Sequence, residues 1–195
     1  MFIELTDHLR CPAEHEEQYL VLLPDRIEDR SVREGRLGCP VCGRTFALEE
    51  GVLDLGGAPA PAETASALVP DAVAALAGLN GPGGYLALVG PPGDEWRGVA
   101  ERLPGVGLVA VNPGPRTVDQ PGLSVLRGGR LPFKTRSMRG VVLGKPYGED
   151  AAWVREAARV VLPGLRVVGE GGVPPSDLIE LMATAGGVWV GTPRR

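Results

Sequence analysis

The pattern of apolar positions in the second half of the chain predicts an alternation of strands and helices. Short runs such as YLALVG at 85–90 are apolar on both faces, which is typical of strands inside a parallel sheet. Segments such as DAAWVREAARVVL at 150–162 repeat their apolar residues at helical spacing. Strands are predicted at 85–90, 107–112, 123–128, 139–144, 165–170 and 188–192, and helices at 95–103, 150–162 and 175–186. This order indicates an α/β fold with a doubly wound, mostly parallel sheet covered on both faces.

The first 56 residues follow a different pattern. They are rich in charge and hold every cysteine and both histidines of the chain. Small residues and prolines follow in GGAPAPAETASALVP, a composition that is typical of a linker. We therefore predict a small β-rich domain at 1–56, a linker at 57–69 and the α/β domain at 70–195.

Composition and charge narrow the classes of partner. With 44% hydrophobic and 23% charged residues among 195, the chain can bury a substantial core. The formal net charge of -4 argues against a general attraction to nucleic acid, which is therefore not favoured as a partner. A local basic run is interpreted as a solvated rim; it comprises Arg127, Arg130, Lys134, Arg136 and Arg139. No apolar run approaches the roughly 20 residues of a membrane helix, so we expect a cytoplasmic protein without a membrane span.

The cysteines form an incomplete pair of metal-binding knuckles. Cys39 and Cys42 make a C-x-x-C knuckle, and Cys11 lies 28 residues before Cys39, beside a proline of its own. Two such knuckles at the tips of hairpins make a zinc ribbon, and so few cysteines suit a metal in a reducing compartment better than disulfides. A complete first knuckle would have a second thiolate at position 14, where Glu14 stands and His15 follows.

We therefore predict a structural zinc site with three cysteines and one histidine. Its ligands are Cys11, His15, Cys39 and Cys42, with Glu14 or His8 as an alternative fourth ligand. A closed site of this kind has no open position for water, so the metal would contribute folding energy and not catalysis. The alternative is an eroded ribbon that binds no metal and is held by apolar residues, namely Leu20, Val21, Leu22, Phe46 and Leu53.

Two resemblances to known families cover most of the chain. LRCPAEHEEQYLVLLPD and GRLGCPVCGRTFALEEGVLDL resemble the small zinc-ribbon proteins that activate methyltransferases; the second knuckle matches closely and the first departs at Glu14. LRGGRLPFKTRSMRGVVLG and WVREAARVVLPGLRVVGEG are similar to class I methyltransferases that use S-adenosylmethionine (SAM). The resemblance implies a methyltransferase-like sheet after the ribbon. It also implies a closing strand hairpin, for which only VWVGTPRR is left.

The resemblance further implies a SAM pocket, and several of its residues are replaced. The family has a glycine-rich turn after the first strand and an acidic residue at the end of the second. Gly90 and Gly93 keep the turn, but Pro91 and Pro92 remove donors between them, and neutral Asn112 replaces the acid. We therefore interpret Gly90, Gly93 and Asn112 as a vestigial SAM pocket and expect no SAM cofactor.

Other positions of the α/β domain also depart from the family. The family's acidic residue near the adenine falls at about Gly128 or Gly129, and LGKPYG has Gly144 where amine-methylating members hold the amino group. Glu149 and Asp150 are interpreted as the start of a helix and not as catalytic acids. No catalytic residue is predicted.

These departures predict a non-catalytic accessory or structural subunit, a pseudo-methyltransferase that binds protein partners in a larger assembly. Two surfaces are predicted to contact the partner: the ribbon around Phe2, Ile3 and Leu5, and the strand rim near Pro91, Pro92, Trp96 and Tyr147. Packing of Trp96 and Trp153 on the sheet is the alternative use of the tryptophans. The alternative function is an active SAM-dependent methyltransferase whose Asn112 holds the ribose, and a third is an RNA-binding ribbon protein.

Overall fold

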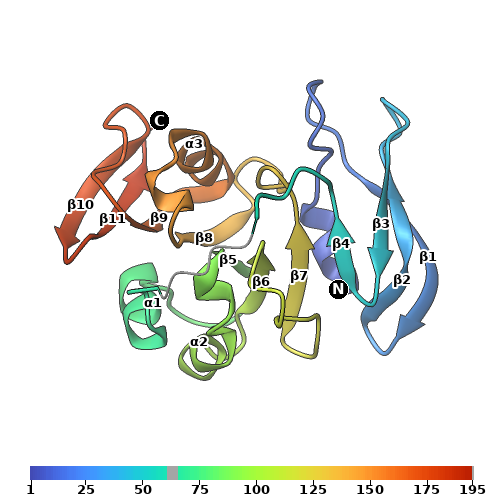
Figure 1. The fold of residues 1–195 in the computed structure, drawn as a ribbon, viewed down its shortest axis with the longest axis horizontal. Coiled ribbons are helices and arrows are strands. Elements are labelled where there is room, and N and C mark those ends of the chain that lie inside the picture. The colour runs from blue at the N-terminus through green and yellow to red at the C-terminus, as the bar shows by residue number, and fades with distance from the viewer. Residues whose placement is uncertain (61–65, 195) are drawn as a thin grey trace.

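The computed structural model describes residues 1–60 and 66–194, and within them eleven strands form a single sheet (Figure 1). The order of the strands across the sheet is β1-β2-β3-β4-β7-β6-β5-β8-β9-β11-β10. The strands are β1 (Val21–Glu28), β2 (Ser31–Gly38), β3 (Thr45–Glu49), β4 (Val52–Asp54), β5 (Tyr85–Val89), β6 (Gly107–Val111), β7 (Leu123–Arg127), β8 (Met138–Leu143), β9 (Val161–Glu170), β10 (Ile179–Ala185) and β11 (Val188–Pro193). The helices are α1 (Pro70–Ala77), α2 (Trp96–Arg102) and α3 (Ala151–Val160), with short 3-10 helices η1 (Ile3–His8), η2 (Pro91–Gly93) and η3 (Tyr147–Glu149).

The centre of the sheet is parallel and its two ends are antiparallel. Strands β4, β7, β6, β5, β8 and β9 run in parallel, while β1 to β4 form an antiparallel meander on one side. On the other side β11 pairs antiparallel with both β9 and β10. The fold is therefore mixed α/β with a large sheet that is parallel at its centre and ends in the hairpin of β10 and β11.

The helix predicted at 175–186 is wrong, because this segment contains strand β10. The segment LIELMATAG holds good helix formers. Strand β10 lies at the end of the sheet with most of its side chains in solvent, so the sequence lacks the alternation of apolar and polar residues that marks a half-buried strand. The turn after it, Gly186-Gly187, has positive φ angles of 58° and 75° at both residues. Such a pair is a hairpin signal. The hairpin thus uses residues on both sides of this turn, beyond VWVGTPRR alone.

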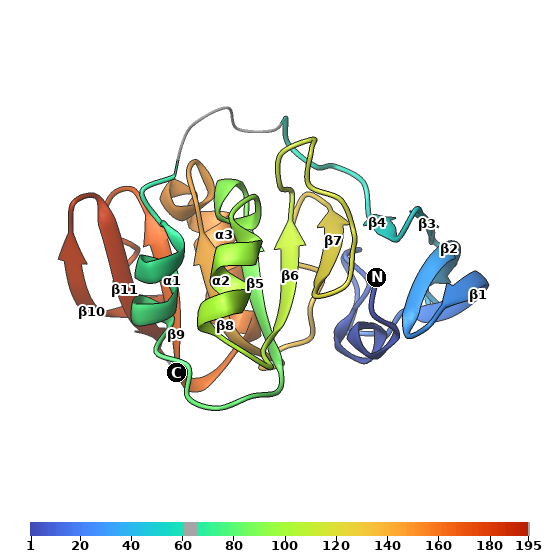
Figure 2. The same cartoon turned by 90° about the horizontal axis from the view of Figure 1, so that it is seen from below.

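Alternating residues of the central strands face two different layers. Leu86 and Leu88 of β5 belong to the cluster under α1 and α2, which lie across one face of the sheet (Figure 2). Ala87 and Val89 belong to the cluster under α3 on the opposite face. Strands buried on both faces explain the unbroken apolar runs of the sequence.

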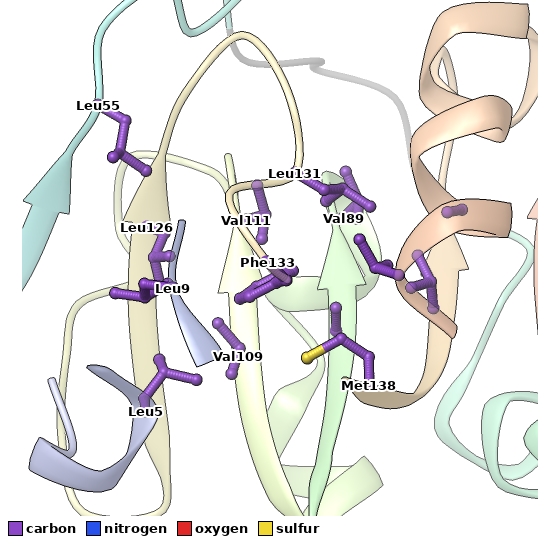
Figure 3. Packing of buried hydrophobic residues seen from close by; sticks show 14 of the residues in the cluster. Leu5, Leu9, Leu55, Val89, Val109, Val111, Leu126, Leu131, Phe133 and Met138 are labelled. Atoms are coloured by element: carbon purple, nitrogen blue, oxygen red, sulfur yellow. The ribbon is translucent and has the colours of Figure 1, made fainter. Parts of the chain in front are cut away.

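The N-terminal segment covers a part of the sheet that has no helix over it. Residues 112–122 and 128–137, all of them described, connect β6 to β7 and β7 to β8 without an α-helix. Leu5 of η1 and Leu9 occupy this place together with Phe133, and all three are fully buried (Figure 3). Leu9 also forms a backbone bridge with Phe133. The first residues of the chain therefore complete the core of the sheet.

Strand pairing and polar contacts also join the N-terminal part of the chain to the α/β part. β4 pairs in parallel with β7, with Leu53 opposite Leu126. The Phe2 N–H donates to Ser124 Oγ at 3.0 Å, and Arg33 Nη1 of β2 donates to Asp119 Oδ1 at 2.8 Å.

The division into domains at 1–56 and 70–195 stays a prediction. Part of the predicted linker, 61–65, lies outside the described residues.

The first of the two predicted contact surfaces, the ribbon around Phe2, Ile3 and Leu5, is wrong as an exposed surface. At the ribbon, Leu5 is buried in the core, and Phe2 and Ile3 are only partly exposed. Leu5 packs there because η1 covers the part of the sheet that has no α-helix over it.

No helix within residues 1–60 and 66–194 is both long and apolar enough to cross a membrane.

Replacing Leu5 by alanine tests the contribution of the N-terminal segment to stability. The free energy of unfolding should fall by about 2–5 kcal/mol, because a fully buried side chain leaves a cavity. Denaturant unfolding followed by tryptophan fluorescence gives the value. Leu23→Ala is the matched control, since Leu23 is exposed on β1 and its loss should cost less than about 0.5 kcal/mol. Equal losses in the two variants would contradict the packing described.

Candidate functional site

Four side chains of the N-terminal part converge at one point. The ligand atoms of Cys11, His15, Cys39 and Cys42 all lie within 4.8 Å of one another, close enough to hold a metal ion. The grouping predicted from the sequence is therefore confirmed. Glu14 and His8, the alternative fourth ligands, are not part of this group. The ring of His8 instead packs edge-to-face on Tyr85, with 5.1 Å between the ring centroids.

The closest distances in this group match a tetrahedral zinc site. With Zn–S bonds of about 2.3 Å and a Zn–N bond of about 2.05 Å, tetrahedral geometry places two sulfurs about 3.8 Å apart and a sulfur and nitrogen about 3.6 Å apart. The Sγ atoms of Cys11 and Cys42 lie 3.7 Å apart, and His15 Nε2 lies 3.4 Å from Cys39 Sγ. All three cysteines have free thiols. The donor set and its spacing thus fit Zn²⁺.

Backbone hydrogen bonds hold the two knuckles. The Cys39 N–H donates to the Arg44 carbonyl at 2.9 Å, and the Gly43 N–H donates to the Cys39 carbonyl at 3.0 Å. Gly43 has a φ of 69°, a left-handed conformation that favours glycine and closes the knuckle behind Cys42. In the first knuckle the Cys11 N–H donates to the Gln18 carbonyl at 2.9 Å.

The second nitrogen of His15 has a partner that selects its tautomer. Nδ1 lies 2.6 Å from the Glu16 carbonyl, which can only accept, so Nδ1 carries the proton and Nε2 faces the sulfurs. Metal-ligating histidines usually have such an outer partner. The same hydrogen bond raises the pKa of the His15 imidazole.

Two thiols of the group differ in acidity. Burial raises the pKa of the Cys11 thiol to about 11. Burial also acts to raise the pKa of the Cys39 thiol, but the N–H groups of Cys42 and Val41 outweigh it and lower the pKa to about 6. A metal binds thiolates, so of these two thiols Cys39 is the better prepared to bind one.

The residues of the predicted SAM pocket lie at the carboxyl ends of β5 and β6, but the protein uses them internally. Asn112 is 4% exposed and makes two hydrogen bonds to one residue. Its Nδ2 donates to the Gly128 carbonyl at 2.8 Å, and its Oδ1 accepts the Gly128 N–H at 2.9 Å. Asn112 therefore ties the end of β6 to the chain just after β7.

The glycine-rich turn is covered by side chains. Gly90 has a φ of 72°, and a Cβ added there would lie 2.6 Å from the ring of Tyr147. A Cβ at Gly93 would lie 3.0 Å from Ala110 of β6, so Gly93 permits close packing of η2 on the sheet. A Cβ at Gly144 would lie 2.4 Å from Pro92. These glycines make room for the protein's own residues.

The predicted contact surface at this rim is also wrong. Pro92, Trp96 and Tyr147 are buried, and only Pro91 is partly exposed. The tyrosine packs edge-to-face on Trp153, with 4.7 Å between their centroids. Packing of the tryptophans on the sheet, the alternative drawn from the sequence, is confirmed for Trp96 and Trp153.

Asp150 has the structural role that the sequence suggested. It is the N-cap of α3, and its Oδ1 accepts the Ala152 N–H at 2.7 Å.

Glu170, a buried acid with several hydrogen-bond partners, was not identified from the sequence. Its buried carboxylate at the end of β9 accepts hydrogen bonds from Ser66 Oγ at 2.8 Å, from the Lys145 N–H at 3.2 Å and from the Ala67 N–H. The sequence does carry a signal for this role, because Glu170 is an acidic residue at the end of an apolar strand.

Comparison with known proteins gives likeness in structure only. No protein-family model matches the chain, and no curated protein matches it. One similar structure is a geranyl diphosphate methyltransferase in complex with GPP and sinefungin, 16% identical over 51% of this chain and 42% of that chain, with a TM-score of 0.44. Another is a complex between the Haloferax volcanii Trm112 methyltransferase activator and a second protein, 22% identical over 45% of each chain, with a TM-score of 0.38. The matched regions span about half of this chain and less than half of the other chains, and at these scores neither likeness assigns a function.

Cobalt binding tests the ligand set. Tetrahedral Co²⁺ with thiolate ligands absorbs strongly in the visible, so titration of the metal-free protein should saturate at one ion per chain. His15→Ala should weaken binding more than about tenfold, because it removes one of the four ligands. Glu14→Ala is the control and should leave the affinity unchanged. An equal effect of the two substitutions, or none, would contradict the assignment of His15.

Asn112→Asp tests the internal use of Asn112. The carboxylate cannot donate to the Gly128 carbonyl, so at neutral pH the free energy of unfolding should fall by about 1–3 kcal/mol. Protonation restores a donor, which means that the folded state raises the pKa of the new acid and the deficit shrinks as the pH falls. Thermal unfolding at neutral and mildly acidic pH measures both effects. A variant as stable as the parent at neutral pH would contradict the bond's role.

Proposed function

We propose that the protein is a non-catalytic accessory or structural subunit that binds a protein partner and does not use SAM. The observation that carries this proposal is the pair of hydrogen bonds between the Asn112 side chain and Gly128. A side chain that recognises ribose hydroxyls must present free acceptors to a cleft. Asn112 presents none to a cleft, because it is 4% exposed and both its carbonyl and its amide bond to the same backbone residue.

Displacing these bonds for a ligand would be costly. Breaking them exposes a buried donor and a buried acceptor, each at about 1–3 kcal/mol. A neutral amide would also make a weaker hydrogen bond to the ribose than the carboxylate it replaces. The cost of breaking the internal bonds and the weakness of the new contact both oppose cofactor binding.

The cover over Gly90 supports the proposal independently. Backbone approach of a ligand to this turn needs open space, and the Tyr147 ring fills it. Tyr147 is 2% exposed and is held by Trp153, so moving the ring would also unpack the tryptophan. A ligand would thus have to break a packed aromatic pair before reaching the backbone.

The metal that we propose is a structural zinc. Cys11 and His15 come from the first knuckle, and Cys39 and Cys42 come from the end of β2 and the turn after it. The ion would cross-link these two segments and supply folding energy, and with four protein ligands it would leave no position for substrate.

The partner surface that we propose is the free edge of β1. This strand ends the sheet, and Val21, Leu23 and Ile27 are 50%, 47% and 46% exposed. An extended segment of a partner protein could add to this edge as a further strand. Pro24 and the register shift beside Arg26 interrupt the distal half of β1, so the pairing region is the half near Val21.

Titration calorimetry with SAM and with its demethylated product tests the proposal. Metal-loaded protein should give no saturable heat up to millimolar ligand, because the contacts at Asn112 and Gly90 are already occupied. The metal-to-protein ratio and a cooperative unfolding transition serve as controls that the sample is folded. Saturable binding at micromolar concentration would overturn the proposal in favour of an active methyltransferase with a divergent pocket.

A further inference from the structure

Arginines gather around two hollows on the face of the sheet that carries α3. The first has a volume of about 220 Å³, and its lining includes Arg130 and Arg155. The second has a volume of about 290 Å³, and its lining includes Arg136, Arg155 and Arg194. Because Arg155 lines both, the hollows belong to one surface. We call it the α3 arginine surface and define it by Arg130, Arg136, Arg155 and Arg194.

The arginines of this surface outnumber the acids beside them. Within residues 1–60 and 66–194, none of the four arginines lies within 4.0 Å of a carboxylate oxygen. Two acids line the hollows: Glu156 in the first, which is paired with Arg159 at 2.8 Å, and Asp177 in the second. A chain with a net charge of -4 therefore carries a locally positive surface, which attracts an anionic partner.

The surroundings favour a phosphate backbone over an acidic protein. Protein interfaces are organised around apolar anchors that insert into the partner. Apolar residues do line the hollows, among them Trp153, Val161 and Leu178, but these side chains are buried or half-buried in the protein's own core, and none of the exposed large hydrophobic side chains of the described residues lines either hollow. Guanidinium groups match the geometry of phosphate oxygens and need no apolar neighbour. Exposed positive charge without an exposed large apolar side chain favours phosphate recognition.

An exposed aromatic ring lies next to this surface. Tyr19 is 57% exposed, and the Lys134 ammonium lies 4.1 Å from the centre of its ring. Thr135, which lines the second hollow, donates from its hydroxyl to Glu17 at 2.8 Å and so brings the segment of Tyr19 to the same region. A ring beside cationic groups is a stacking platform for an unpaired base.

We propose that the α3 arginine surface binds the phosphate backbone of a single-stranded nucleic acid, with Tyr19 as a stacking position at its margin. The basic run read from the sequence as a solvated rim supplies Arg130 and Arg136, and the fold adds Arg155 and Arg194 to them. This binding does not rest on the proposed function, because neither the result with SAM nor the identity of a protein partner alters the expected result with nucleic acid.

Fluorescence anisotropy with labelled oligonucleotides of about 15 nucleotides tests this proposal, using the full metal-loaded chain. Binding to oligo-uridine RNA should saturate at low salt, and log K should fall with log salt with a slope of about -2 to -3, as expected for three or four phosphates at about 0.7 each. Arg155→Glu should weaken binding at least about fivefold and reduce the slope by about 0.7. Arg116→Glu is the matched control: Arg116 is exposed and lines neither hollow, so the same change of charge should have little effect.

The outcomes separate the sources of the phosphate. Equal binding of oligo-thymidine DNA would assign the backbone phosphates alone, and tighter binding of RNA would add contacts to the 2′-hydroxyl; both support the proposal. No saturable binding at low salt would overturn it. Equal losses in Arg155→Glu and Arg116→Glu would also overturn it, as would displacement of the oligonucleotide by poly-glutamate at matched charge, which would identify an acidic protein as the partner.

Discussion

Leu5 and Leu9 close a face of the sheet that would otherwise be open to water. The connections from β6 to β7 and from β7 to β8 contain no α-helix, so the apolar side chains of these strands on this face need another cover. The N-terminal segment supplies it and adds β4 to the edge of β7. Cys11 follows Leu9 by two residues, which means that a metal held by Cys11 would also fix the segment that buries the leucines. Packing, strand pairing and metal site therefore depend on one another.

This arrangement explains why the protein's own residues fill the rim at the carboxyl ends of the strands. After β7 the chain bends at Gly129 and Arg130 before it reaches Phe133, which pairs with Leu9 of the N-terminal segment. The hydrogen bonds from Asn112 hold the backbone at Gly128, just before that bend. Asn112 stands at the position where the methyltransferases that the sequence resembles have an acidic residue. A residue that elsewhere would face a ligand here stabilises the fold, and this exchange is the physical basis of the proposed non-catalytic role.

The sequence predicted those features that depend on local pattern. β5 to β9 were found because strands buried on both faces give unbroken apolar runs, and the cysteine and histidine group was found from the spacing of its knuckles. Strand β10 was missed because its residues favour helices and its exposed position leaves no alternation of apolar and polar residues. The burial of Leu5, the bonds of Asn112 and the role of Glu170 depend on contacts between residues far apart in the chain, and no local pattern encodes them. The presence of zinc and the division into domains stay predictions.

The interlock of the two parts can be measured directly by unfolding the cobalt-loaded protein with two probes. Visible absorption reports on Cys11, His15, Cys39 and Cys42, whereas fluorescence reports on Trp96, Trp153 and Trp189, which all lie in the α/β part. If the N-terminal segment completes the core of the sheet, the two signals should change together at one denaturant midpoint. Loss of the cobalt signal at a lower midpoint, with tryptophan fluorescence still native, would show two independent units and contradict the account.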